Sequence, residues 1–111
     1  MSDIANVNYV LCTGSEIELE FRPEYIPLIA LGTKVMTTRK NKKGEVGDYF
    51  ILEGKKHVLV EVSERTLYSI ANLFHKEEGF ESAEDFRREW DLCYPDFKFN
   101  PYQKVWTHRW G

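Results

Sequence analysis

The chain has 111 residues, of which 42% are hydrophobic and 30% charged, and this length and composition are typical of one globular domain. Its 15 basic and 18 acidic residues give a formal net charge of -3, which argues against broad coating of a polyanion by bulk charge. The apolar runs are too short to span a bilayer and the first residues do not form a secretory signal. We therefore expect a cytoplasmic protein in which Cys12 and Cys93 are reduced.

The first part of the chain is predicted to combine short strands with one helix. Polar and apolar residues alternate over 16–21, which is typical of a half-buried strand. Pro23 can begin a helix that Gly32 ends, and Pro27 in its first turns makes that helix short or irregular. A polar loop over 40–47 and a tight turn at Gly54-Lys55 then separate strands predicted at 35–39, 49–52 and 57–62.

The second part is predicted to contain two helices and a last strand. The first helix ends at Gly79, and its apolar face is formed by Leu67, Ile70, Leu73 and Phe74. Ser82 can cap the second, which Pro95 closes and whose core-facing side carries Phe86, Trp90 and Cys93. Residues 104–110 alternate again as a strand. The fold class is therefore α+β, with a small, largely antiparallel sheet or barrel flanked by helices.

Basic residues gather in one segment although the whole chain is acidic. Between residues 34 and 56, three acidic residues accompany seven basic ones: Lys34, Arg39, Lys40, Lys42, Lys43, Lys55 and Lys56. Such a local positive segment can contact phosphate groups, and the alternative is a solvated loop at a strand turn.

The same segment contains the most specific motif. Gly32-Thr33-Lys34-Val35-Met36-Thr37-Thr38-Arg39, followed by Gly47-Asp48, resembles the ASCH family, whose members carry G-x-K-x-x-T-x-R and a polar loop ending in G-D. Glu77-Glu78-Gly79-Phe80 and the aromatic last strand extend the resemblance over nearly the whole chain. It implies one ASCH-like domain over 16–111 after a leading segment 1–15, a PUA-like β-barrel with a cleft beside the helices, and a role in RNA metabolism.

Some ASCH proteins are amidohydrolases that deacetylate 4-N-acetylcytidine, and their functional residues resemble Lys34, Thr37 and Glu78 of this chain. The resemblance implies that Lys34 is a base, Thr37 the nucleophile and Glu78 an acid. From its chemistry, the nearby Arg39 is a candidate to steady an oxyanion or a phosphate. Residues three apart on a strand face opposite ways, so Lys34 must lie in the turn after Gly32 to meet Thr37. Whether Glu77 or Glu78 faces the cleft is left open.

The preferred function is binding of RNA or a modified nucleoside in a cleft with a basic lip. The alternative is the amidohydrolase, and a third interpretation is a protein-interaction module whose acidic helices meet a basic partner. His57, His75 and His108 lack the short spacings of a zinc site, so no metal is expected. The chain has no P-loop or dinucleotide fingerprint, and no cofactor is expected.

Overall fold

The computed structural model describes residues 14–111, and the expectations for residues 1–13, including Cys12, lie outside this part of the chain. In chain order the elements are the 3-10 helix η2 (Pro23–Tyr25), α1 (Ile26–Ala30), β1 (Met36–Arg39), β2 (Tyr49–Leu52), β3 (Lys55–Thr66), α2 (Leu67–Leu73), α3 (Ala83–Cys93) and β4 (Lys104–Trp110). None of the described helices is long and apolar enough to cross a membrane.

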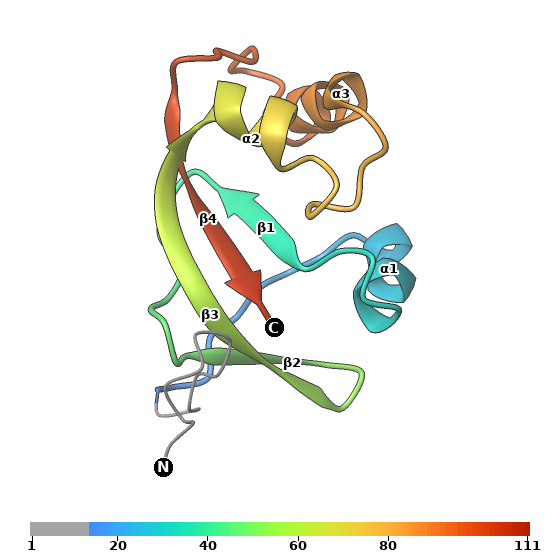
Figure 1. Ribbon diagram of the computed structural model, residues 1–111, viewed down its shortest axis with the longest axis vertical. Helices are drawn as coiled ribbons and strands as arrows, with labels where there is room; N and C mark the ends of the chain where they lie inside the picture. The colour runs from blue at the N-terminus through green and yellow to red at the C-terminus, as the bar shows by residue number, and fades with distance from the viewer. Residues whose placement is uncertain (1–13) are drawn as a thin grey trace.

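The strands form one antiparallel sheet in the order β1-β4-β3-β2, which confirms the α+β class. The long β3 pairs with β2 through its first residues and with β4 through the rest, and its register shifts between Leu59 and Glu61. A shift of this kind bends a strand, and β3 curves along the length of the molecule (Figure 1). Helices α2 and α3 gather at one end of the sheet, and α1 lies beside β1 (Figure 1).

The strand predicted over 16–21 is wrong. The backbone there forms only an isolated parallel bridge between Glu16 and Tyr49. The alternating pattern instead reflects one-sided burial, because Ile17, Leu19 and Phe21 pack against a core cluster while the intervening glutamates are exposed. Period-2 burial therefore occurs here without a hydrogen-bonded strand partner.

Two apolar clusters lie on opposite faces of the sheet. One is built around Met36, Leu67, Ile70, Phe86, Trp90 and Val105 and joins the sheet to α2 and α3. The other joins the sheet to α1 through Ile29, Phe50, Leu59 and Trp110. Adjacent residues of β1 point to opposite faces, so this strand contributes side chains to both sides of the sheet.

Helix α2 is shorter than predicted, and this changes the surroundings of the two glutamates. It ends at Leu73, whose side chain is 70% exposed rather than on the buried face. A series of turns follows, in which the Glu78 amide donates to the Phe74 carbonyl and Gly79 has φ of 97°. Glu77 and Glu78 thus belong to a turn after the helix, where they can be directed to different neighbours.

Helix α3 begins as predicted and carries an unexpected exposed thiol. The Ser82 side chain accepts a hydrogen bond from the Asp85 amide and caps the helix. Phe86 and Trp90 are buried, but Cys93 is an exposed free thiol, so the prediction of a core cysteine is wrong. Cys93 sits at the last turn of the helix, beyond the packed apolar face.

Candidate functional site

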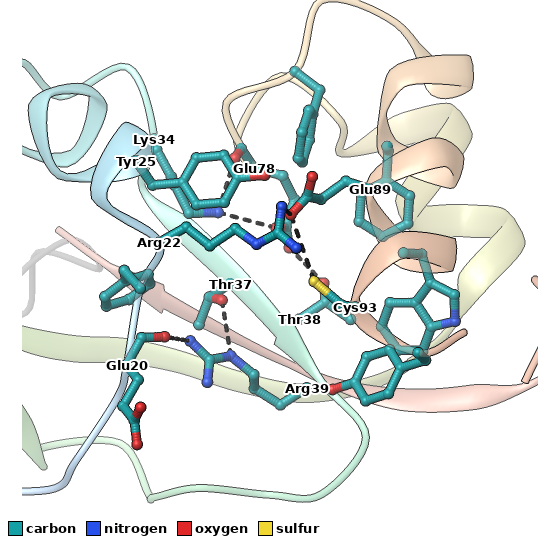
Figure 2. A pocket seen from close by; sticks show the side chains of 15 residues that line it. Glu20, Arg22, Tyr25, Lys34, Thr37, Thr38, Arg39, Glu78, Glu89 and Cys93 are labelled. Carbon is teal, nitrogen blue, oxygen red and sulfur yellow. Dashed lines mark hydrogen bonds and ion pairs between the residues drawn. The ribbon is translucent and has the colours of Figure 1, made fainter. Parts of the chain in front are cut away.

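A pocket of about 170 Å³ lies between β1, the segment 20–25 and α3 (Figure 2). Its apolar walls come from Phe21, Phe80, Phe86, Trp90 and Tyr94. Polar groups from β1 and from the turn after α2 also line it, and these include three of the residues that the motif singled out for catalysis, Lys34, Thr37 and Glu78. The pocket therefore combines aromatic walls with a concentrated polar surface.

Lys34 is buried in the turn that leads into β1. The amides of Thr33 and Lys34 both donate to the Leu28 carbonyl, and Gly32 has φ of 80°. This turn directs the Lys34 side chain inward, where 3% of the residue is exposed. Its Nζ donates to the Met36 carbonyl at 2.8 Å, the Glu78 carbonyl at 2.8 Å and Glu78 Oε1 at 3.2 Å. Three acceptors match the three donors of an ammonium group.

Glu78 is the inward glutamate of the pair. It is 3% exposed, and its second carboxylate oxygen accepts a hydrogen bond from the Thr38 hydroxyl. Glu77 points elsewhere, since its carboxylate pairs with Arg109 at 3.6 Å and its carbonyl accepts from the amides of Val35 and Met36, where the chain enters β1. The Glu78 carboxylate is thus fixed between an ammonium and a hydroxyl, a geometry that holds it in one orientation.

Thr37 and Arg39 form a second polar pair in the pocket. They share a strand face, and Arg39 Nε donates to Thr37 Oγ1 at 3.1 Å. Arg39 also donates to the Glu20 carbonyl at 2.8 Å, while the Glu20 carboxylate points away from the pocket (Figure 2). Burial lowers the pKa of Arg39, and the nearby acidic groups oppose that shift. Among the described residues, Arg39 makes no ion pair with a carboxylate.

The wall formed by α3 contributes polar groups that the sequence did not indicate. Glu89 Oε2 pairs with Arg22 at 3.3 Å and accepts from the Cys93 thiol at 3.5 Å (Figure 2). Burial and then a hydrogen bond with Glu89 raise the pKa of Tyr25. Burial, followed by the charge of Glu89, also raises the pKa of Cys93, which keeps it a neutral thiol at pH 7. The only sequence signal for this contact is the spacing of four residues between Glu89 and Cys93, which places them on the same side of one helix.

The basic residues predicted to contact nucleic acid fall into two separate groups. Lys34 and Arg39 line the pocket, and Lys40 lies over the rings of Phe97 at 4.1 Å and Tyr94 at 5.5 Å. Lys42 and Lys43 follow in the same loop. Lys55 and Lys56 lie at the turn between β2 and β3 and border a different hollow beside Trp110. The structure therefore does not bring Lys55 and Lys56 to the pocket.

The loop that carries Lys42 and Lys43 is anchored by a buried histidine. The Lys43 amide donates to His108 Nε2 at 3.0 Å, and His108 Nδ1 lies 3.4 Å from the Thr37 carbonyl. This pattern assigns the proton of a neutral imidazole to Nδ1. Burial lowers the pKa of His108 to about 4, with smaller contributions from Arg39, Lys43 and Lys42, and the Thr37 hydrogen bond opposes the shift. His108 is thus neutral at pH 7.

No group of three or more His, Cys, Asp or Glu side chains within residues 14–111 is arranged to hold a metal ion.

Solved structures with the same fold are ASCH domains and a related protein. The ASCH domain of Lactobacillus crispatus superposes with a TM-score of 0.64 at 15% identity, covering 88% of this chain and 79% of that one. A mutant of the Zymomonas mobilis ASCH protein gives 0.60 at 13% identity, covering 86% and 67%. An Enterococcus faecalis protein of family DUF984 gives 0.56 at 14% identity, covering 92% and 77%. No family model matches the chain, and no curated protein matches it in sequence.

The fold is therefore that of an ASCH domain, a small α+β domain of the PUA-like type, as the motif implied. The likeness concerns the path of the backbone.

Proposed function

We propose that this ASCH-fold domain binds one nucleoside unit, free or within RNA, in the pocket between β1 and α3. The observation that carries the proposal is a pocket of about 170 Å³ with aromatic walls and fixed polar groups. A cavity of about 150 Å³ accepts a benzene ring, so this one has room for a single ring of a base. Aromatic side chains favour the flat faces of bases, and fixed polar groups can read their edges.

Arg39 is the group best placed to meet an acceptor on the ligand. Its Nε and one terminal nitrogen are held by neutral oxygens of Thr37 and Glu20, and no described carboxylate neutralises it. A half-buried guanidinium with spare donors favours a base carbonyl or a phosphate oxygen. By contrast, the charge of Lys34 is matched within the protein by Glu78.

Titration of nucleosides and their 5′-monophosphates, followed by tryptophan fluorescence, tests this proposal because Trp90 lines the pocket. Saturable binding is expected, and Arg39→Met should weaken it by about tenfold, the scale of a hydrogen bond to a charged group. Arg88→Met removes the same charge from an exposed position on α3 and serves as the control. Failure of the whole panel to bind, or equal affinities of both variants and the parent, would contradict the proposal.

A second candidate function is hydrolysis of an amide on a modified nucleoside, such as 4-N-acetylcytidine. The specific observation in its favour is the contact between the Thr38 hydroxyl and the Glu78 carboxylate, which Lys34 holds in place. Because all three donors of Lys34 Nζ are used, Glu78 is the better placed proton acceptor in this arrangement. This differs from the roles that the resemblance to amidohydrolases implies, in which Lys34 is the base and Thr37 the nucleophile.

The hydrolytic step can be written with Glu78 as the proton carrier. Glu78 takes the proton of a hydroxyl or water as that oxygen bonds to the acyl carbon, and the C–N bond then breaks. The same proton passes to the nitrogen of the leaving amine. A water attack gives the acid directly, and a threonine attack gives an ester that one water then hydrolyses to the acid and the free hydroxyl.

Release of acetate from 4-N-acetylcytidine tests this candidate. Glu78→Gln should abolish turnover while the nucleoside still binds, and Thr37→Val and Thr38→Val identify which hydroxyl, if either, takes part. Turnover that survives Glu78→Gln would rule out Glu78 as the proton carrier. A parent protein that hydrolyses none of a panel of acylated nucleosides would rule out the hydrolase and leave nucleoside binding as the proposed function.

We propose a cytoplasmic location, because RNA is present there and a free thiol such as that of Cys93 stays reduced there.

A further inference from the structure

Two lysine–aromatic pairs flank the end of β1 where Arg39 enters the pocket. On one side Lys40 lies over Phe97 and Tyr94, and Tyr94 itself lines the pocket. On the other side Lys42 lies 5.2 Å from the ring centre of Trp106. We define these five residues as the basic–aromatic rim: Lys40, Lys42, Tyr94, Phe97 and Trp106.

Sheet register joins the rim to the pocket. Arg39 is paired with Trp106 across β1 and β4, and directly opposed residues of an antiparallel pair project from the same face. Strand β1 is an edge of the sheet, so the end of this strand is open on the side away from β4. A chain that leaves the pocket beside Arg39 would therefore meet Trp106 or Tyr94 next.

The Lys42 side of the rim is also fixed in place. The Lys43 amide bonds to the fully buried His108, which tethers the loop next to Lys42, and His108 lies on the same strand as Trp106. Phe97, by contrast, is 57% exposed, so its ring is available to a ligand once Lys40 moves aside. Lysine side chains have long flexible stems, and their displacement toward phosphate needs no backbone movement.

We propose that the partner of the pocket is a single-stranded polynucleotide whose neighbouring bases stack on the basic–aromatic rim. Stacking platforms beside positive charge are the arrangement by which proteins hold single strands without reading their sequence. Phosphates between the bases pair with Lys40 and Lys42, which release the rings they now cover, and Lys42 also exchanges its ion pair with Glu45, at 2.6 Å, for the phosphate. This inference rests on the proposed nucleoside pocket. It assigns Lys40 and Lys42 to polynucleotide binding and leaves out Lys55 and Lys56, which lie at another hollow.

The test compares 5′-mononucleotides with the corresponding homotrinucleotides for each of the four ribonucleotides. One base in the pocket and one on each side predict affinity that rises to about three nucleotides and then levels off. Phe97→Ala removes an exposed platform and should lower the ratio of trinucleotide to mononucleotide affinity by about tenfold, within the range measured for base stacking. A long homopolymer duplex should bind more weakly than its separate single strands of the same length, because its bases cannot leave the stack.

Salt dependence supplies the matched control. The affinity for the homotrinucleotide is measured at several salt concentrations. Replacing Lys40 and Lys42 together by Ala should reduce the slope of log affinity against log salt by about 1.4, the value for two phosphate contacts on a single strand. Replacing Lys55 and Lys56 by Ala removes the same charge elsewhere and should leave the slope unchanged. Circular dichroism and thermal unfolding check that each variant is folded.

The outcomes separate the two proposals. Two results would contradict binding at the rim without affecting the nucleoside pocket. One is equal affinity for mononucleotides and trinucleotides. The other is an equal salt slope for the Lys40/Lys42 and Lys55/Lys56 double variants. Absence of binding to any mononucleotide or trinucleotide would overturn the pocket proposal on which the rim depends. Equal affinity for the single strand and the duplex would also overturn stacking on the rim.

Discussion

The buried pair of Lys34 and Glu78 gives the most quantitative prediction. Lys34→Met removes the ammonium but keeps an unbranched apolar chain of similar length. The Glu78 carboxylate then loses its 3.2 Å partner while only 3% of the residue is exposed, and two carbonyl oxygens lose a donor. Breaking a buried ion pair on one side costs about 3–5 kcal/mol, because the charge left behind is neither paired nor hydrated.

Urea unfolding at pH 7, followed by tryptophan fluorescence, measures this loss. The double variant Lys34→Met with Glu78→Met should recover most of it, since removal of both charges leaves no uncompensated buried charge. Arg88→Met breaks an ion pair whose side chains are 67% and 42% exposed, so it should cost less than about 1 kcal/mol. A loss for Lys34→Met no larger than that for Arg88→Met would refute the reasoning. So would a double variant as unstable as the single one.

Three further predictions concern His108, a glycine and a helix cap. The pKa of His108 is lowered to about 4 in the folded protein, so the unfolded chain takes up this proton first as the pH falls. The free energy of unfolding should therefore decrease as the pH drops from about 6.5 to 4. In urea unfolding, His108→Gln should make the free energy of unfolding depend less on pH over this range. Gly79→Ala should lower the melting temperature more than Gly54→Ala, because both have positive φ but only the new Cβ at 79 meets Lys34 Cβ, at 3.2 Å. Ser82→Ala should cost about 1 kcal/mol in the same assay, the value of an N-cap, and an unchanged midpoint would contradict the capping role.

Several elements could be predicted from the sequence because their signals are local. Residues 49–52 and 104–110 become β2 and β4 with the predicted bounds. Turn residues on both sides limit the apolar run of β2, and alternation marks β4. The cap at Ser82 is likewise a local contact with its own helix. These features depend on neighbours within a few residues along the chain.

Features that depend on distant partners could not be predicted in this way. The segment 16–21 has the burial of a strand but lacks a ladder, because its backbone finds only an isolated bridge at Tyr49. Helix α2 stops at Leu73 although the apolar pattern continues through Phe74. At 16–21 the outcome depends on whether a distant strand takes up the backbone hydrogen bonds. After α2, the Glu77 carbonyl accepts from the amides of Val35 and Met36, which belong to a distant part of the chain.

The candidate site also combines residues that a local motif indicates with residues that only the fold brings together. The motif around β1 supplied Lys34, Thr37 and Arg39, and the structure places all three in the wall of one pocket. Thr38, which contacts Glu78, was missed because alternation assigns it to the opposite face from Thr37. Glu89 belongs to one of the acidic helices that the protein-interaction interpretation offers to a basic partner, yet it lines the pocket and pairs with Arg22. A charge reversal at Glu89 would therefore perturb the pocket and does not probe a surface partner.

The central claim is that the pocket between β1 and α3 accepts a nucleoside unit. A 1H–15N NMR titration of the folded protein with the tightest-binding nucleoside monophosphate tests it most directly, since each amide and the Arg39 Nε group report separately. The account predicts that the largest shifts fall on Thr37, Thr38, Arg39 and Gly79, with little change at Lys55 and Lys56. Shifts that gather at the β2–β3 turn, or none at saturating ligand, would contradict it.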